Sequence, residues 1–151
     1  MLTQNQKAFL ELIGTSEGTS TIKGSDRGYN VLVGGTLFTS YADHPRKLVD
    51  LGHGLLSTAA GKFQILARYF DVYKKQLDLP DFSPASQDAV ALTMIGECKA
   101  LDDIEDGDIQ AAINKCGSRW ASFPSSPYGQ PVQKAKTLID AYVAAGGSLL
   151  S

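Results

Sequence analysis

The sequence predicts an α+β fold in which a small antiparallel sheet interrupts a set of helices. An apolar helical stripe stands near the N-terminus, and residues 18–62, rich in Gly, Ser, Thr and Asp, show no sustained helical period. Helical periodicity returns after Gly61 and continues toward the C-terminus. This order predicts one domain over residues 1–151, with a mostly helical lobe, a sheet lobe at approximately 20–60 and a cleft between them.

The first helix is expected over about residues 4–14. Thr3 and Gln6 fit a capping box, and the apolar positions from Phe9 to Ile13 then share one helical face. Gly14 is a plausible stop, which places Glu17 in the last turn or just beyond it.

A hairpin is expected next. Residues 29–33 have the apolar, β-branched character of a strand, Gly34-Gly35 is a two-residue turn signal, and residues 36–39 can form the return strand.

The later helices are marked by their stripes and caps. One stripe over residues 65–73 stops near Pro80, Ser83-Pro84 begins the next helix, and Asp108 caps a third. Three prolines make residues 123–131 a loop, and a last helix ends at Gly146-Gly147.

Composition gives no support for several function classes. A net charge of −2 with scattered lysines and arginines gives no sign of nucleic-acid binding, and no apolar run is long enough to span a bilayer. No signal peptide is recognised at the N-terminus, so the expected site of synthesis is the cytoplasm. We expect no metal and no cofactor.

The potential metal ligands do not form a known site. Cys98 and Cys116 lack zinc spacing and are expected as buried reduced thiols, although a disulfide between them cannot be deduced from spacing. The acidic run over residues 101–108 fails as a calcium loop because Ile104 falls at a ligand position. His44 and His53 are too far apart for a zinc motif.

Glu17 is the first candidate for chemistry. An apolar helix end can raise the pKa of its carboxyl, and the adjoining polar loop can admit a substrate, which is what a general acid needs. From this residue alone, a solvated helix-end glutamate is the more common case. Asp26 could complete a carboxylate pair of the glycosidase type, but its setting favours a turn residue. Tyr128, in a Pro/Gly loop outside any apolar stripe, is suited to contact a sugar ring.

The chain strongly resembles the lambda-type phage endolysins, which are lytic transglycosylases of lysozyme-like fold. The resemblance rests first on Ser16-Glu17-Gly18-Thr19 and on residues 57–64, Ser-Thr-Ala-Ala-Gly-Lys-Phe-Gln. Further matching segments follow in the family's order over nearly the whole chain: 6–10, 28–29, 33–35, 37–39, 43–49, 82–84, 86–92, 120–122 and 128–130.

The resemblance implies roles for single residues. Glu17 falls on the catalytic glutamate, and Gly61 and Gln64 fall on the family's Gly-x-Tyr-Gln motif, whose glutamine helps to hold the saccharide. Phe63 replaces the tyrosine of that motif, so its hydroxyl is absent here. Tyr128 falls on the aromatic residue of a lip loop.

Ser57 and Thr58 lie in the cleft-edge segment that precedes the motif. The substrate implied by the resemblance is the β-1,4 bond between N-acetylmuramic acid and N-acetylglucosamine in peptidoglycan, cleaved by a monomer with formation of a 1,6-anhydro product. The family also implies accumulation in the host cytoplasm and release when a holin opens the inner membrane.

Two alternatives stay open at this point. A hydrolytic phage-type lysozyme would use Glu17 together with Asp26, and its products would carry a reducing end. A non-catalytic cell-wall-binding module would keep the fold but would not degrade the wall.

Overall fold

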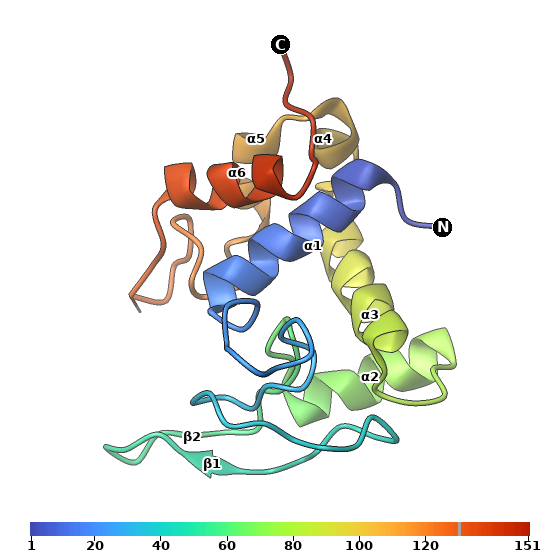
Figure 1. Cartoon of the computed structure of the whole chain (residues 1–151), viewed down its shortest axis with the longest axis vertical. Coiled ribbons are helices and arrows are strands. Elements are labelled where there is room, and N and C mark those ends of the chain that lie inside the picture. The colour runs from blue at the N-terminus through green and yellow to red at the C-terminus, as the bar shows by residue number, and fades with distance from the viewer. Residues whose placement is uncertain (130) are drawn as a thin grey trace. The chain divides into compact units, whose positions relative to one another are not determined.

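The computed structural model describes residues 1–129 and 131–151, and its helices and strands are labelled in Figure 1. Its elements, in order, are α1 Gln4–Glu17, β1 Val49–Asp50, β2 Leu56–Ser57, α2 Ala67–Leu77, α3 Pro84–Glu97, α4 Leu101–Asp106, α5 Ile109–Cys116 and α6 Ala135–Ala144. This content confirms the α+β class. Within the described residues, every helix is too short or too polar to cross a bilayer.

The chain forms two compact units. One unit joins Met1–Glu17 to Ala91–Ser151, and the other is the continuous segment Gly18–Val90. The second unit begins close to where the sheet lobe was expected, but it also includes α2 and the first half of α3.

The core of the first unit is built around α1. This helix packs along α6, and the two helices lie side by side in Figure 1. The rings of Phe9 on α1 and Phe123 meet edge to face with centroids 6.4 Å apart, and Trp120 packs on Phe123 at 5.8 Å. These three side chains are fully buried, as expected for the large aromatic residues of a small core.

The core of the second unit is an aromatic cluster. Phe82 lies next to both Phe70 and Phe38, with ring centroids 4.9 and 6.1 Å apart. Tyr29 and Phe63 form a separate edge-to-face pair at 6.1 Å. These pairs hold the irregular segments of this unit, which have little sheet of their own.

Several predicted helix boundaries are confirmed. The N–H of Gln6 donates to Thr3 Oγ1 and the N–H of Thr3 donates to Gln6 Oε1, both at 3.1 Å, which is the predicted capping box. Asp108 caps α5 by accepting the N–H of Ala111 at 3.2 Å. The helix predicted after Ser83 begins at Pro84.

The predicted end of the first helix was wrong by three residues. Gly14 is buried inside α1, which continues to Glu17. The residue that leaves the helix is Gly18, whose φ of 77° places it in the left-handed region. Glu17 is therefore the last helical residue.

The predicted hairpin is present in a short form, in which the N–H of Leu32 donates to the carbonyl of Thr36 at 2.7 Å and the N–H of Phe38 donates to the carbonyl of Asn30 at 2.9 Å. Val31 pairs with Leu37, and Leu32 pairs with Ala60, so neighbouring residues of this segment pair with different parts of the chain. The antiparallel sheet lies instead at β1 and β2, with Val49 opposite Ser57 and Asp50 opposite Leu56. The acidic run, for which no helix of its own was predicted, contains the short helix α4.

Candidate active site

Glu17 stands at the C-terminal end of α1. The residue is only partly exposed, and burial of its carboxyl raises the pKa from an ordinary value of 4.5 to about 7. Loss of hydration disfavours the carboxylate, so the neutral acid persists to a much higher pH than in water. A carboxyl of this kind can give up a proton near neutral pH and take one back.

The end of α1 is held firmly within its own unit. Ser16, the neighbour of Glu17, is buried and shares a 2.6 Å hydroxyl–hydroxyl hydrogen bond with Ser122. Ser122 lies between Trp120 and Phe123, which belong to the aromatic core described above. The helix turn that carries Glu17 is thus fixed by a polar bond and by packing.

Tyr128 lies in the Pro/Gly-containing loop of the same unit and is 56% exposed. Its hydroxyl donates to the carbonyl of Ser118 at 2.7 Å, and its N–H donates to Ser126 Oγ at 3.3 Å. These bonds set the direction of the ring and leave much of it open to solvent. Gln130, the last residue of the matching segment 128–130, lies outside the described residues.

Residues 61–64 form a tight loop in the unit Gly18–Val90. Its ends are joined by two backbone hydrogen bonds between Ala60 and Ile65, at 3.1 and 2.9 Å. Gly61 has a φ of 83°, and a Cβ at this position would overlap the side-chain amide of Gln87. Glycine is therefore required both by the backbone conformation and by the lack of space.

Gln87, on α3, is the buried partner of this loop. Its Oε1 accepts the N–H of Lys62 at 3.0 Å, and its Nε2 donates to the carbonyls of Tyr29 at 3.0 Å and Phe82 at 2.9 Å. All three bonds reach backbone groups, so this side chain takes the place that a neighbouring strand would have in a sheet.

Gln64 ends the loop in the left-handed conformation, with a φ of 53°. Its Nε2 donates to the carbonyls of Gly61 at 2.9 Å and Val31 at 3.3 Å. These two bonds engage both N–H groups of the amide, and any further contact from an amide hydrogen would require them to break.

Phe63 and Lys62 point into the core rather than out of the loop. Each is 1% exposed, Phe63 packs on Tyr29, and Lys62 Nζ lies 4.6 Å from the centroid of the Tyr29 ring. The structure therefore does not place Phe63 where a sugar could touch it, because its ring is used in packing. Lys62 had not been singled out from the sequence, since a lysine is rarely fully buried.

Ser57 and Thr58 line a surface pocket of about 400 Å³. The remaining lining residues are Leu48, Leu56, Leu66, Ala67 and Arg68. Thr58 Oγ1 accepts the N–H of Ala67 at 3.0 Å and so caps α2, while Ser57 Oγ accepts the N–H of Ala59 at 3.1 Å. Both hydroxyls thus shape the segment that leads into the 61–64 loop.

A polar network that the sequence did not reveal supports the far end of this loop. The His44 ring nitrogen Nε2 lies 2.8 Å from the carbonyl of Ile65, and Nδ1 accepts the N–H of Arg46 at 2.9 Å. These partners favour the neutral tautomer with its proton on Nε2. The ring packs against Phe70 and Phe82, and burial lowers the pKa of His44 below its ordinary 6.5.

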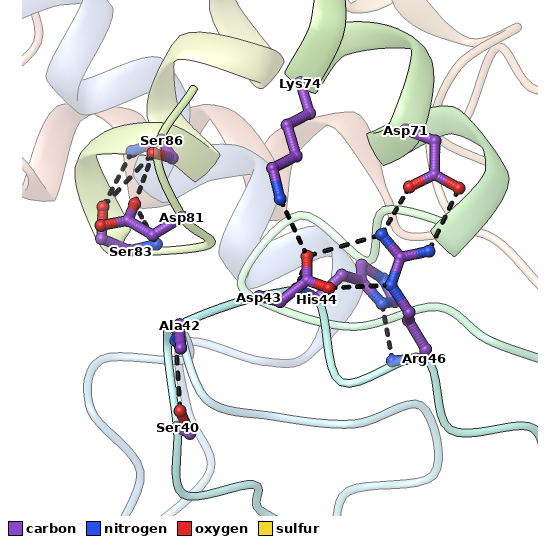
Figure 2. A network of polar contacts seen from close by, with 10 residues as sticks. All are labelled: Ser40, Ala42, Asp43, His44, Arg46, Asp71, Lys74, Asp81, Ser83 and Ser86. Carbon is purple, nitrogen blue, oxygen red and sulfur yellow. Dashed lines mark hydrogen bonds and ion pairs between the residues drawn. The ribbon is translucent and has the colours of Figure 1, made fainter. Parts of the chain in front are cut away.

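Figure 2 shows the charged part of the same network. The Arg46 guanidinium lies between the carboxylates of Asp43 and Asp71, and Lys74 approaches Asp43 at 3.5 Å. Hydrogen bonds from Arg46 hold the pKa of both carboxyls below the ordinary value. The segment from 43 to 46 is thereby tied to α2. The signal in the sequence was the run Asp-His-Pro-Arg-Lys, which carried the resemblance but no assigned role.

Asp26 is occupied in a turn. Its Oδ2 accepts the hydroxyl of Tyr41 at 2.7 Å, and its N–H donates to Asn30 Oδ1 at 2.8 Å. Arg27 lies 3.7 Å from its other oxygen. These contacts agree with the prediction of a turn residue.

In the part of the chain that the structure describes, no three His, Cys, Asp or Glu side chains lie close enough together to hold a metal ion. The acidic residues near Asp108 serve the ends of α4 and α5 instead, with Asp108 as the cap of α5.

Comparison with known proteins agrees with the motifs. The endolysin family model matches residues 7–149. The endolysin of Escherichia phage lambda is 51% identical over 150 residues, covering 98% of this chain and 95% of its own. The endolysin of Escherichia phage P2 is 43% identical over 155 residues, covering 95% of this chain and 94% of its own.

Solved structures give the same result. The structure of bacteriophage lambda lysozyme complexed with a chitohexasaccharide matches with a TM-score of 0.96 and 51% identity, covering 99% of this chain and 98% of that one. A second structure of bacteriophage lambda lysozyme matches with a TM-score of 0.91 and 50% identity over the same shares. The fold is therefore lysozyme-like, and the chain belongs to the endolysin family of phage enzymes that degrade peptidoglycan.

Proposed function

We propose that this endolysin is a lytic transglycosylase in which Glu17 is the only general acid and base. The bond cleaved is the β-1,4 linkage between N-acetylmuramic acid and N-acetylglucosamine. Protonated Glu17 donates its proton to the leaving glycosidic oxygen as the sugar approaches an oxocarbenium-like state. The resulting carboxylate then accepts the proton of the muramic acid C6 hydroxyl, whose oxygen attacks C1 and closes a 1,6-anhydro ring.

The burial of the Glu17 carboxyl at the end of α1, which raises its pKa, carries this proposal. At a value of about 7, the carboxyl is about half protonated at neutral pH, so the acid and its conjugate base are both accessible during one turnover. The C6 hydroxyl belongs to the substrate and has a high effective concentration at C1. A second carboxylate that activates water is therefore unnecessary.

The engagement of Asp26 also supports a single-carboxylate mechanism. The hydroxyl of Tyr41 and the nearby Arg27 both contact the carboxylate of Asp26 in its turn. A nucleophile or base in a hydrolytic mechanism would have to give up these partners. The hydrolytic alternative thus gains no support from the contacts of Asp26.

The contacts of each side chain support the substrate-binding role that we propose for it. We assign Gln64 Oε1 as an acceptor for the substrate N-acetyl group, because the two N–H groups of this amide are bonded to Gly61 and Val31. The exposed ring of Tyr128 is suited to stack on a sugar. Phe63 and Gly61 act indirectly, by shaping the loop. The related lambda lysozyme was solved in complex with a chitohexasaccharide, which supports a glycan as the ligand of this chain.

The residues before the loop are assigned to the edge of the binding surface. Ser57 and Thr58 border a pocket that also presents Arg68, so this surface offers hydroxyl and cationic groups to a glycan and its substituents. We further propose that the protein acts as a monomer and reaches peptidoglycan after a holin has opened the inner membrane. A single species of monomeric mass in light scattering, with and without soluble glycan, would support the proposed monomer.

Mass spectrometry of digested cell wall tests the proposed reaction. Purified peptidoglycan is digested with wild-type enzyme, with Glu17→Gln and with Asp26→Asn. We expect wild type and Asp26→Asn to release muropeptides lighter by one water than the products of a hydrolytic lysozyme, and Glu17→Gln to release almost none. Muropeptides with a reducing-end muramic acid, lost in Asp26→Asn, would instead establish the hydrolytic mechanism.

A further inference from the structure

Two cysteines that lie far apart in the sequence occupy neighbouring helix ends. Cys98 is the first residue after α3, and Cys116 is the last residue of α5. Both belong to the same compact unit, and both are free thiols in the structure.

Contacts between their neighbours fix the two positions relative to each other. Glu97, directly before Cys98, accepts a 2.8 Å ion-pair hydrogen bond from Arg119, three residues after Cys116. Lys99, directly after Cys98, has a carbonyl 3.4 Å from Nζ of Lys115, directly before Cys116. The segment around Cys98 is thus bonded to the segment around Cys116 on both sides.

The two thiols lie next to each other between these contacts. Burial raises the pKa of Cys116 above its ordinary value, and the neighbouring thiol of Cys98 raises it further. Cys116 is fully buried, whereas Cys98 is partly exposed. The Cys98 thiol can therefore be reached from solvent, whereas the Cys116 thiol is buried next to it. In thiol–disulfide exchange, the accessible thiol would react first with an oxidant and the buried thiol would then react with it.

We propose that Cys98 and Cys116 are a redox site that forms an intramolecular disulfide when the protein meets an oxidising environment. Because the two side chains are neighbours, the bond requires that their sulfur atoms approach to bonding distance. This redox site is independent of the role assigned to Glu17.

The oxidant is a disulfide compound of low molecular mass or a protein disulfide. The Cys98 thiolate attacks one sulfur of the oxidant, forming a mixed disulfide and releasing one thiolate of the oxidant. The Cys116 sulfur, on losing its proton, then attacks Cys98 Sγ and releases the second thiolate. Two electrons pass from the protein to the oxidant, and the protons lost by the two cysteines pass through solvent to the released thiols.

The expected benefit follows from where an endolysin works. Thiols stay reduced in the cytoplasm, whereas disulfides persist in the compartments that contain cell wall. A bond between Cys98 and Cys116 would enclose α4 and α5 and so restrict the unfolded chain. The enzyme would become more stable only where its substrate is found.

The experiment measures thiol status of the purified full chain. Protein is equilibrated with oxidised glutathione or with dithiothreitol, denatured in the presence of an alkylating agent, and weighed intact by mass spectrometry. We expect two alkyl groups on the reduced protein, and none on the oxidised protein, which should weigh two hydrogens less before alkylation. Peptide mapping should recover residues 98 and 116 in one cross-linked fragment.

The control variant is Cys98→Ser, chosen because Cys98 is the more exposed cysteine and its replacement leaves the core intact. Oxidation should raise the Tm of wild type by about 5 °C and leave that of Cys98→Ser unchanged. Two thiols that stay alkylatable, a persistent glutathione adduct on Cys98 or disulfide-linked dimers would each overturn the proposal. A cross-link that forms without any shift in Tm would overturn its stabilising role.

Discussion

The carboxyl of Glu17 and the carboxyls around Arg46 lie in opposite environments, which shift their pKa values in opposite directions. Glu17 is withdrawn from water, and burial alone raises its pKa to about 7. Asp43 and Asp71 remain in water beside a guanidinium, and hydrogen bonds from Arg46 lower their pKa. The same functional group is thus kept protonated to a higher pH in one place and kept ionised to a lower pH in the other.

The difference extends to the surroundings of these groups. In the unit Gly18–Val90, polar side chains such as Gln87 and His44 are paired with backbone groups and maintain the shape of an irregular chain. At the end of α1, burial removes water from the carboxyl of Glu17 and raises its pKa, and among the residues that the structure describes no ion pair or hydrogen bond lowers that pKa again. This comparison agrees with the proposal that the polar contacts of the unit Gly18–Val90 fix geometry and that Glu17 transfers the proton.

The largest expected effect is on activity. Glu17→Gln removes the proton but keeps the size of the side chain, so lysis of chloroform-treated cells should fall by at least about 10²-fold. Turbidity loss per mole of folded enzyme is the measurement, with Asp43→Asn as the comparison carboxyl variant. Wild-type turbidity loss in Glu17→Gln would contradict the distinction between the two kinds of carboxyl.

The same variant has an opposite effect on stability. A carboxyl whose pKa rises on folding favours the native state most below pH 4.5, and this contribution is lost as pH rises through about 7. Above pH 7, Glu17→Gln should therefore exceed wild type in free energy of unfolding by up to about 3 kcal/mol. Urea denaturation at pH 4 and pH 8 measures this difference. An equal gap at both pH values would show that the carboxylate is not destabilised by burial.

The sequence was sufficient to predict features that depend on neighbouring residues. The Thr3–Gln6 capping box and the Asp108 cap are local patterns, and the structure shows both. The α+β class followed from periodicity. The pattern at the end of the first helix made Glu17 a candidate, and the resemblance assigned both Glu17 and Gln64 to the site.

The remaining features depend on residues that are distant in sequence. The sheet at β1 and β2 has only two residues per strand, and Leu56 is exposed. The sequence of these strands therefore shows no alternation of apolar and polar residues that could predict them. The role of His44 requires the carbonyl of Ile65, and the need for glycine at position 61 arises from Gln87. Such contacts are set by tertiary packing and leave no local signal.

Gly61→Ala tests the geometric region. Gly24 has the same φ of 83°, but a Cβ added there would meet nothing within 4 Å, so Gly24→Ala is a matched control for backbone strain. We expect Gly24→Ala to cost about 1 kcal/mol. Gly61→Ala should cost about 2–4 kcal/mol more, because Gln87 must move and lose buried hydrogen bonds. Equal denaturation midpoints for the two variants would contradict the fit described for the loop.

A smaller effect on stability is expected when the pH is lowered. Burial lowers the pKa of His44, so its contribution to stability is present above pH 6.5 and is lost as pH falls through the pKa of the folded state. Replacing His44 by Gln should lower stability at pH 7 but flatten the loss between pH 6.5 and 4. His53→Gln, at an exposed position, serves as control. Unchanged pH dependence of Tm in His44→Gln would remove His44 from the network that fixes this region.

The smallest effect is expected from Asp26→Asn. The substitution weakens a partly exposed bond to Tyr41, so activity should change by less than about threefold and unfolding by less than about 1 kcal/mol. Initial rates of wall lysis measure the first quantity. A loss comparable to that of Glu17→Gln would make Asp26 a second catalytic carboxyl.

The contrast between the two kinds of carboxyl depends most directly on the ionisation of Glu17. Carbon-13 NMR of protein labelled at the glutamate side-chain carboxyl, assigned with Glu17→Gln, would follow this group from pH 3 to pH 9. We predict a midpoint near pH 7 for Glu17. A midpoint near the ordinary value of 4.5 would contradict the proposed mechanism, because Glu17 would then be fully ionised at neutral pH and could not act as the acid.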